Sequence, residues 1–181
     1  MAKIKNLLSL SLLFSILFLT SCKDNDNTVS VPEPTSKILT TRYIKNPDLP
    51  QYFKFSTADT SQTNWDVKFT VVPVIGAPTP TYSPSILLNS QNEVVAKIVD
   101  SLEFTNVSFD TTGFQHDEDS TYVIGTNCFQ YSHTTHQLLP YQNRTFIVRT
   151  TDNKLVKFKM LSYYNEQNQS GYMKLEYLIK Q

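Results

Sequence analysis

The sequence has little of what small stapled folds and phosphate-binding loops require: two cysteines and four glycines among 181 residues. Two cysteines form at most one disulfide, which excludes a disulfide-rich scaffold. The four glycines are isolated from one another, so no glycine-rich loop is present to cradle a phosphate. The G-x-S-x-G and H-E-x-x-H motifs are also absent. We therefore expect a protein that is not an enzyme.

An excess of either charge is also lacking, because 16 Lys and Arg residues balance 16 Asp and Glu residues. Nucleic-acid binding would need a basic patch, so no nucleic-acid partner is expected. The acidic stretch Asp117–Asp119 lacks the alternate spacing and the glycine of a calcium loop. We interpret it as a solvated turn.

No hydrophobic run is long enough to cross a membrane as a helix. The longest, Leu7–Leu19, has 13 residues interrupted only by serine, whereas a span needs about 20. Lys3 and Lys5 precede it, which is typical of a secretory signal peptide. The run leads into Leu-Thr-Ser-Cys at positions 19–22, which resembles a bacterial lipobox. Residues 1–21 are therefore predicted to be a lipoprotein signal peptide and Cys22 to carry the lipid that anchors the chain to a membrane.

Lipidation of Cys22 leaves Cys128 without a partner for an intrachain disulfide. A lone cysteine is usually a small buried apolar residue, and no catalytic role is expected for Cys128. Removal of residues 1–21 takes away two lysines and no acid, so the mature chain has 14 basic and 16 acidic residues, a net charge of −2.

Residues 22–37 are predicted to be the lipidated cysteine and a flexible tether. The segment is polar and contains two prolines without apolar periodicity. Its Lys-Asp-x-Asp start at residues 23–26 resembles the signal that sends some lipoproteins of Gram-negative bacteria to the outer surface of the outer membrane. A solvated linker facing the periplasm is the alternative.

Residues 38–181 are predicted to form a single, mainly antiparallel all-β domain. Between Trp65 and Val71 apolar and polar residues alternate, which is typical of a half-buried strand. Residues 145–150 are rich in strand-forming residues, residues 154–164 and 172–179 alternate in the same way, and short polar turns join the three segments. They predict an antiparallel meander at the C-terminus.

One short helix is expected over residues 90–102. Ser90 and Glu93 have the spacing of a capping box, and apolar residues follow at helical spacing up to Leu102. The proline-rich segment Pro73–Pro84 is predicted to be a long irregular loop.

Two separated stretches resemble the HmuY family of haem-binding lipoproteins. The first, residues 52–70 (YFKFSTADTSQTNWDVKFT), contains an aromatic strand and an Asn-Trp-Asp motif at 64–66. The second, residues 131–177, starts with Tyr-x-x-x-x-His-x-x-x-Pro, formed by Tyr131, His136 and Pro140. It continues through a Val-Arg-Thr strand, an Asp-Asn turn, a Lys-rich strand ending in Ser-Tyr-Tyr and a final Gly-Tyr strand.

The resemblance implies a non-enzymatic, lipid-anchored protein of the outer membrane that captures haem for iron acquisition. It further implies transfer of the haem to an outer-membrane haem receptor. Family members bind the iron through two axial side chains, His in some and Met in others. The candidate ligands are His136, His133 and His116, with Met160 and Met173 as weaker candidates. No metal other than haem iron is expected.

The spacing of His133 and His136 limits what this pair can do. Two axial ligands must approach the iron from opposite faces of the porphyrin. Residues at i and i+3 point the same way on a helix and lie on either side of one backbone on a strand. Neither arrangement encloses a flat ring, so at most one of the two is expected to bind the iron.

Two other functions remain open. Residues 73–127 depart from the family pattern, and Cys128 stands where a tryptophan is expected. Both favour an interaction or adhesion lipoprotein of the same fold that does not bind haem. The fold class and the aromatic content alone would also suit a carbohydrate-binding β-sandwich.

Overall fold

Strands dominate the part of the chain that the computed structural model describes, residues 35–180. The predicted signal peptide, Cys22 and most of the predicted tether lie outside the described residues. The strands are β1 (Lys37–Thr40), β2 (Gln51–Phe53), β3 (Val67–Pro73), β4 (Tyr82–Leu88), β5 (Val95–Val99), β6 (Phe129–Ser132), β7 (Gln137–Pro140), β8 (Thr145–Arg149), β9 (Leu155–Tyr164) and β10 (Ser170–Ile179). Two short 3-10 turns, η1 (Ser90–Asn92) and η2 (Phe104–Asn106), complete the set.

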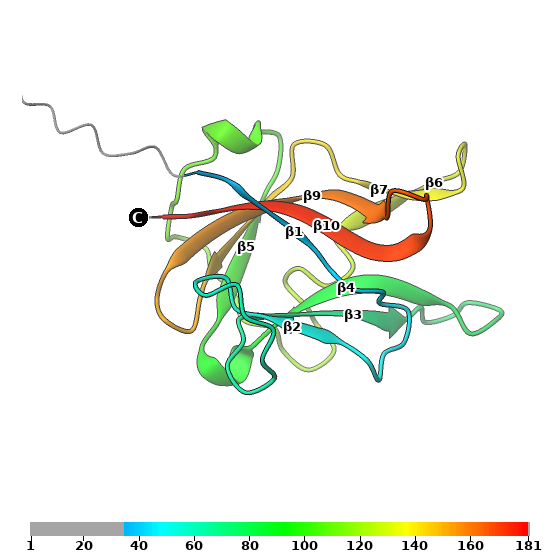
Figure 1. Cartoon of the computed structure of the whole chain (residues 1–181), viewed down its shortest axis with the longest axis horizontal. Coiled ribbons are helices and arrows are strands. Elements are labelled where there is room, and N and C mark those ends of the chain that lie inside the picture. Colours follow the sequence, from blue (N-terminus) through cyan, green and yellow to red (C-terminus); the bar gives the residue numbers. More distant parts are fainter. Residues whose placement is uncertain (1–34, 181) are drawn as a thin grey trace, which may run out of the picture. The chain divides into compact units, whose positions relative to one another are not determined.

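Every strand pairing is antiparallel (Figure 1). A five-stranded sheet has the order β1-β10-β9-β8-β5, a three-stranded sheet the order β2-β3-β4, and β6 and β7 form a separate hairpin. The prediction of a mainly antiparallel all-β domain is confirmed. The predicted C-terminal meander is confirmed as well, because β8, β9 and β10 are consecutive neighbours in one sheet.

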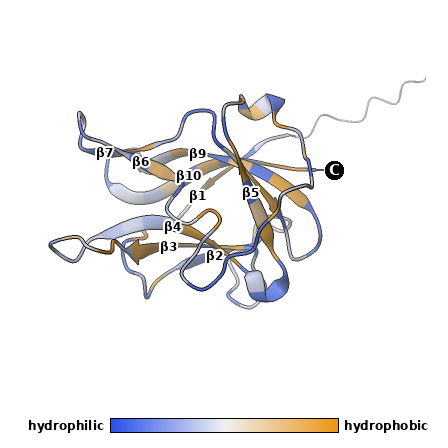
Figure 2. Cartoon of the chain, turned by 180° about the vertical axis from the view of Figure 1, so that it is seen from behind, coloured by the Kyte–Doolittle hydropathy of each residue, from blue (hydrophilic) through white to orange (hydrophobic). Residues whose placement is uncertain are grey.

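The core lies between the two larger sheets. Phe55 stacks on Phe158 with ring centroids 5.8 Å apart, and Phe53 meets Tyr177 edge to face at 6.0 Å. Figure 2 shows hydrophobic residues concentrated on the strands and hydrophilic residues on many of the connecting loops. Burial of each large apolar side chain contributes about 1.5 to 3 kcal/mol, so this aromatic layer helps to hold the two sheets together.

The predicted helix over residues 90–102 is wrong. Its capping-box start forms only the 3-10 turn η1, which Glu93 ends with a left-handed φ of 59°. The following valines and isoleucine form β5, which pairs with β8. β-Branched side chains favour strands, and the open edge of β8 offers hydrogen bonds that outweigh the local helical spacing.

The irregular loop predicted over Pro73–Pro84 is shorter than expected. β3 continues to Pro73 and β4 begins at Tyr82, so the two strands form a hairpin whose connection is residues 74–81. Residues 71–89 carry no charged side chain. The prolines at positions 73 and 84 sit within the strands rather than in the loop.

Asp66 joins the two sheets from a fully buried position, with 0% of its surface exposed. Its carboxylate accepts hydrogen bonds from the backbone N–H of Phe55, from the backbone N–H of Thr151 and from the Thr151 hydroxyl, each at 2.9 Å. Lys54 extends the network by donating to Asn64 Oδ1 at 2.8 Å and to Thr151 Oγ1 at 3.0 Å. The Asn-Trp-Asp motif therefore has a structural role: it ties β2 and β3 to the turn between β8 and β9.

Lys157 fixes the segment that contains η2. It is buried on β9, and its Nζ donates to the carbonyls of Phe104 and Val107 at 2.9 and 2.8 Å. Burial lowers the pKa of Lys157. The amine caps carbonyls that would otherwise be buried without partners, which holds the segment against the sheet.

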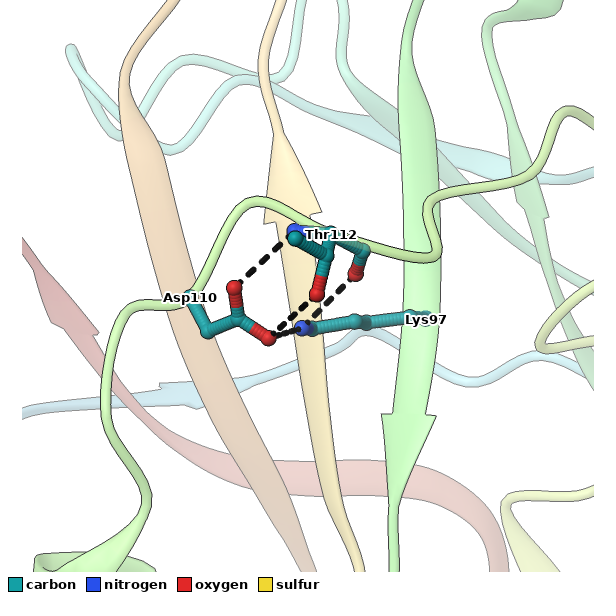
Figure 3. A network of polar contacts seen from close by, with 3 residues as sticks. All are labelled: Lys97, Asp110 and Thr112. Carbon is teal, nitrogen blue, oxygen red and sulfur yellow. Dashed lines mark hydrogen bonds and ion pairs between the residues drawn. The ribbon is translucent and has the colours of Figure 1, made fainter.

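A polar network closes the next loop onto β5, as Figure 3 shows. Lys97 Nζ lies 2.6 Å from Asp110 Oδ2 and donates to the Thr112 carbonyl at 2.9 Å. Asp110 also accepts from the Thr112 N–H at 3.0 Å and from its hydroxyl at 2.8 Å. The hydrogen bond from Lys97, followed by those from Thr112, holds the pKa of Asp110 well below its usual range.

We expect Asp110→Asn to speed amide hydrogen exchange at Thr112, because the substitution removes the anionic acceptor. Since the folded-state pKa of Asp110 is depressed, its stabilising effect is present above the usual Asp pKa of 3.8 and is lost only as the pH falls through the lower folded-state value. In the unchanged chain, exchange at Thr112 should therefore stay protected relative to its intrinsic rate between pH 7 and pH 4. Equal protection in Asp110→Asn and in the control Asp119→Asn would contradict this prediction.

Candidate functional site

A cavity of about 440 Å³ lies between the β3–β4 hairpin and the β6–β7 hairpin. Both hairpins extend toward the same side of the domain, away from the end of β10 (Figure 1). This volume falls in the range of about 300 to 1,000 Å³ that is usual for small-molecule sites. We call it the hairpin cavity; its walls are Lys45, Val71, Pro80, Thr81, Tyr82, Tyr131, His136, Leu138, Tyr163, Tyr164 and Ser170.

Four of the ten tyrosines line the hairpin cavity. Tyr82 and Tyr131, on opposite hairpins, are 48% and 50% exposed and so have ring surface free for a ligand. Tyr163 is buried, and desolvation raises the pKa of its phenol to about 12. The Tyr164 hydroxyl accepts a hydrogen bond from the Leu138 N–H at 2.9 Å, which ties β7 to β9. Two tyrosines therefore build the wall, and two can contact a ligand.

His136 brings an imidazole to this cavity. It is the last residue of the four-residue turn 133–136 between β6 and β7, with a left-handed φ of 54°. Histidine is among the non-glycine residues that tolerate this conformation. Its Nδ1 lies 2.8 Å from the Tyr131 hydroxyl oxygen.

His133, at the other end of the turn, packs its ring edge to face against Tyr131, with centroids 5.1 Å apart. It is exposed and is not part of the cavity wall. Both histidines therefore contact the same phenol from one hairpin. This arrangement does not place one imidazole on each face of a flat ring.

His116 lies far from the hairpin cavity. The neighbouring Asp117 accepts hydrogen bonds from the N–H groups of Leu88 at 2.7 Å and Val123 at 2.8 Å, which fixes this segment at the end of β4. Tyr82 lies at the start of β4, about 20 Å away at roughly 3.3 Å per residue. His116 is too distant to share an iron with His136. Burial raises the pKa of Asp117, whose carboxylate has a structural role here.

The two methionines also lie away from this cavity. Met173 is fully buried in the core. Met160 is buried too, but it lines a second cavity of about 630 Å³ on the other face of the β6–β7 hairpin. The hairpin separates the two spaces, because Gln130 and Leu139 face the second cavity.

Sequence reasoning missed Tyr82 and Lys45 as site residues. Lys45 is the charged side chain of the cavity wall, and it comes from the segment between β1 and β2. An uncharged stretch around Tyr82 was the signal available in the sequence. That signal gives no indication of which distant residues the tyrosine faces.

Cys128 is buried, as expected, and its thiol donates to the Gly125 carbonyl at 3.2 Å. Burial raises the pKa of this thiol to about 12. Within residues 35–180, no three His, Cys, Asp or Glu side chains gather to hold a metal ion. In the same range, no helix has the length and apolar character that crossing a membrane would require.

The family model described as HmuY protein matches residues 44–177 of this chain. No curated protein matches this chain in sequence. The matched range contains the hairpin cavity and the Asp66 network.

Three solved structures share the fold. The apo HmuY analogue of Tannerella forsythia is 14% identical, with a TM-score of 0.54 over 84% of this chain and 99% of its own. A Bacteroides vulgatus protein described as HmuY-like and heme-binding is 10% identical, with a TM-score of 0.54 over 79% of this chain and 91% of its own. Apo PinO from Porphyromonas gingivitis is 9% identical, with a TM-score of 0.55 over 82% of this chain and 99% of its own.

Proposed function

The chain belongs to the HmuY family, and from this premise we propose that it binds haem in the hairpin cavity. The HmuY family is a family of binding and uptake proteins associated with haem. The observation that carries the proposal is the presence of an imidazole, His136, in an aromatic cavity of ligand-binding size.

The residues of the cavity fit a haem group. A porphyrin needs an apolar slot and an axial donor for its iron. Tyr82 and Tyr131 offer ring surface from the two hairpins, and His136 offers the donor. Lys45 would supply a cation to the haem carboxylates. No catalytic residue is proposed.

Among the candidate ligands, we propose His136 as the one that binds the iron. His133 lies on the same turn but outside the cavity wall, His116 lies at the far end of β4, and Met173 is enclosed in the core. The other imidazoles and thioethers of the described residues do not line this cavity. A second protein donor, if used, would therefore be a tyrosine of the opposite wall, such as Tyr82.

We also propose that the protein is anchored in the outer membrane through a lipid on Cys22 and faces the cell surface. The lipobox-like end of the signal sequence and the Lys-Asp-x-Asp start of the tether support this location. An outer-membrane haem receptor would be the partner that takes the haem.

The proposal is tested by titrating haemin into the mature chain carrying Cys22→Ser, which prevents lipidation. We expect a shifted Soret band and saturation near one haemin per chain. Metal-free protoporphyrin is the control: it should bind more weakly, because only the iron can use His136. Weak, non-saturating uptake of both porphyrins would overturn the proposal and favour an interaction lipoprotein without haem.

A further inference from the structure

We infer that Tyr131 is a positioning residue that prepares His136 for the iron by accepting a hydrogen bond from its Nδ1–H. This inference rests on the proposed function and adds a residue that acts through His136. The carrying observation is the distance of 2.8 Å between the Tyr131 hydroxyl oxygen and His136 Nδ1.

In this contact either the Tyr131 hydroxyl or the Nδ1–H of His136 can be the donor, depending on which ring nitrogen carries the imidazole proton. If the phenol donates to Nδ1, the imidazole proton sits on Nε2, and the only lone pair, on Nδ1, is already used as the hydrogen-bond acceptor and is not free for a metal. If Nδ1–H donates to the phenol oxygen, Nε2 keeps its lone pair. A histidine that binds a metal almost always donates its other N–H to a fixed oxygen, which sets the tautomer and the ring orientation. The second arrangement is the one that suits iron binding.

Tyr131 is held where this role requires it. It lies on β6 directly opposite Leu138 of β7, so the hairpin pairing fixes its backbone. The His133 ring packs edge to face against the Tyr131 ring, with centroids 5.1 Å apart. His136 ends the turn with a left-handed φ of 54°. In this conformation its Nδ1 lies within hydrogen-bond distance of the Tyr131 hydroxyl. The two histidines of the turn thus have different tasks: His136 faces the ligand, and His133 supports the phenol.

The first test uses the protein without haem. In ¹⁵N NMR spectra of the mature Cys22→Ser chain, we expect His136 to carry its proton on Nδ1 when neutral. In Tyr131→Phe, which keeps the half-exposed ring and loses only the hydroxyl, the proton should move to Nε2. Tyr82→Phe is the matched control, because it removes a hydroxyl from the same cavity without touching His136. A proton on Nε2 in the unchanged chain, or the same tautomer in both chains, would overturn the inference.

The second test uses haemin. Tyr131→Phe should weaken haemin binding about tenfold, in line with the 10- to 100-fold effect of losing such a partner. It should also raise the iron reduction potential, because a histidine that no longer donates from Nδ1 is a weaker base toward ferric iron. His116→Ala, which changes a side chain at the far end of β4, should leave the potential unchanged. A potential that does not differ between Tyr131→Phe and the unchanged chain would overturn the inference.

The two proposals fail separately. If the unchanged chain takes up no haemin, the haem function is lost, while the NMR spectra of the free protein still decide whether Tyr131 sets the tautomer of His136. If haemin binds but the tautomer is the wrong one, the haem function stands and the role of Tyr131 is lost.

Discussion

Replacing Asp66 by alanine is expected to lower the free energy of unfolding by about 3 kcal/mol, the largest effect on stability that we predict. The substitution removes the fully buried carboxylate that accepts from the N–H groups of Phe55 and Thr151. Each unsatisfied buried donor costs about 1 to 3 kcal/mol. The loss also loosens the attachment of β2 and β3 to the β8–β9 turn, so the two sheets separate more easily.

Urea unfolding of the mature Cys22→Ser chain measures this effect, with the midpoint falling at an unchanged slope. Asp48→Ala serves as the control, because Asp48 is exposed and its carboxylate makes no hydrogen bond described in the structure. Thr151→Val provides a second comparison. It should lower the free energy of unfolding less in the Asp66→Ala protein than in the unchanged chain, because in Asp66→Ala the Thr151 hydroxyl has already lost its carboxylate acceptor. Equal stability of Asp66→Ala and Asp48→Ala would show that the network does not join the sheets.

Replacing His136 by alanine is expected to weaken haemin binding about 100-fold. Loss of a residue that only supports a metal ligand weakens metal binding about 10- to 100-fold, so loss of the ligand itself should reach at least the upper end of that range. The ferric spectrum should lose the features of histidine ligation, because no other imidazole lines the cavity in the described part of the chain. The fold should be retained, since His136 is exposed at a hairpin turn.

The other histidines provide the matched comparisons. His116→Ala should leave haemin affinity unchanged, because His116 lies at the far end of β4. His133→Ala should weaken binding only a few-fold, through the less firmly held Tyr131 ring. A loss of affinity in His116→Ala that matches the loss in His136→Ala would contradict the proposed site.

The sequence predicted the strands whose side chains alternate with period two. Met173, Leu175 and Tyr177 on β10 are buried while their neighbours are partly exposed, and the alternation is visible in the sequence because each face meets one environment. The helix prediction failed at residues whose apolar spacing is compatible with a helix and also with a strand. Val95, Ile98 and Val99 satisfy a helical spacing, but their place in β5 was decided by the free edge of β8.

The candidate site was only partly visible in the sequence. The family resemblance makes His133 and His136 candidates, and His136 occupies the histidine position of the family pattern. The spacing argument limited the pair to one ligand, and the structure places only His136 in the cavity wall. Its contact with Tyr131 joins residues five positions apart, yet the sequence does not show that the intervening turn brings their side chains together.

The sequence by itself determined the fold class, the order of the C-terminal strands and the features that predict a lipid-anchored chain, because hydrophobic alternation, turn residues and a lipobox are local patterns. Tertiary structure alone decided which histidine faces a cavity and that Tyr82 and Lys45 share its wall. These residues are separated by dozens of positions, and they meet only because two hairpins and the segment before β2 are packed around the same sheets. Contacts of that kind depend on how whole strands pair and pack, and no local periodicity records them.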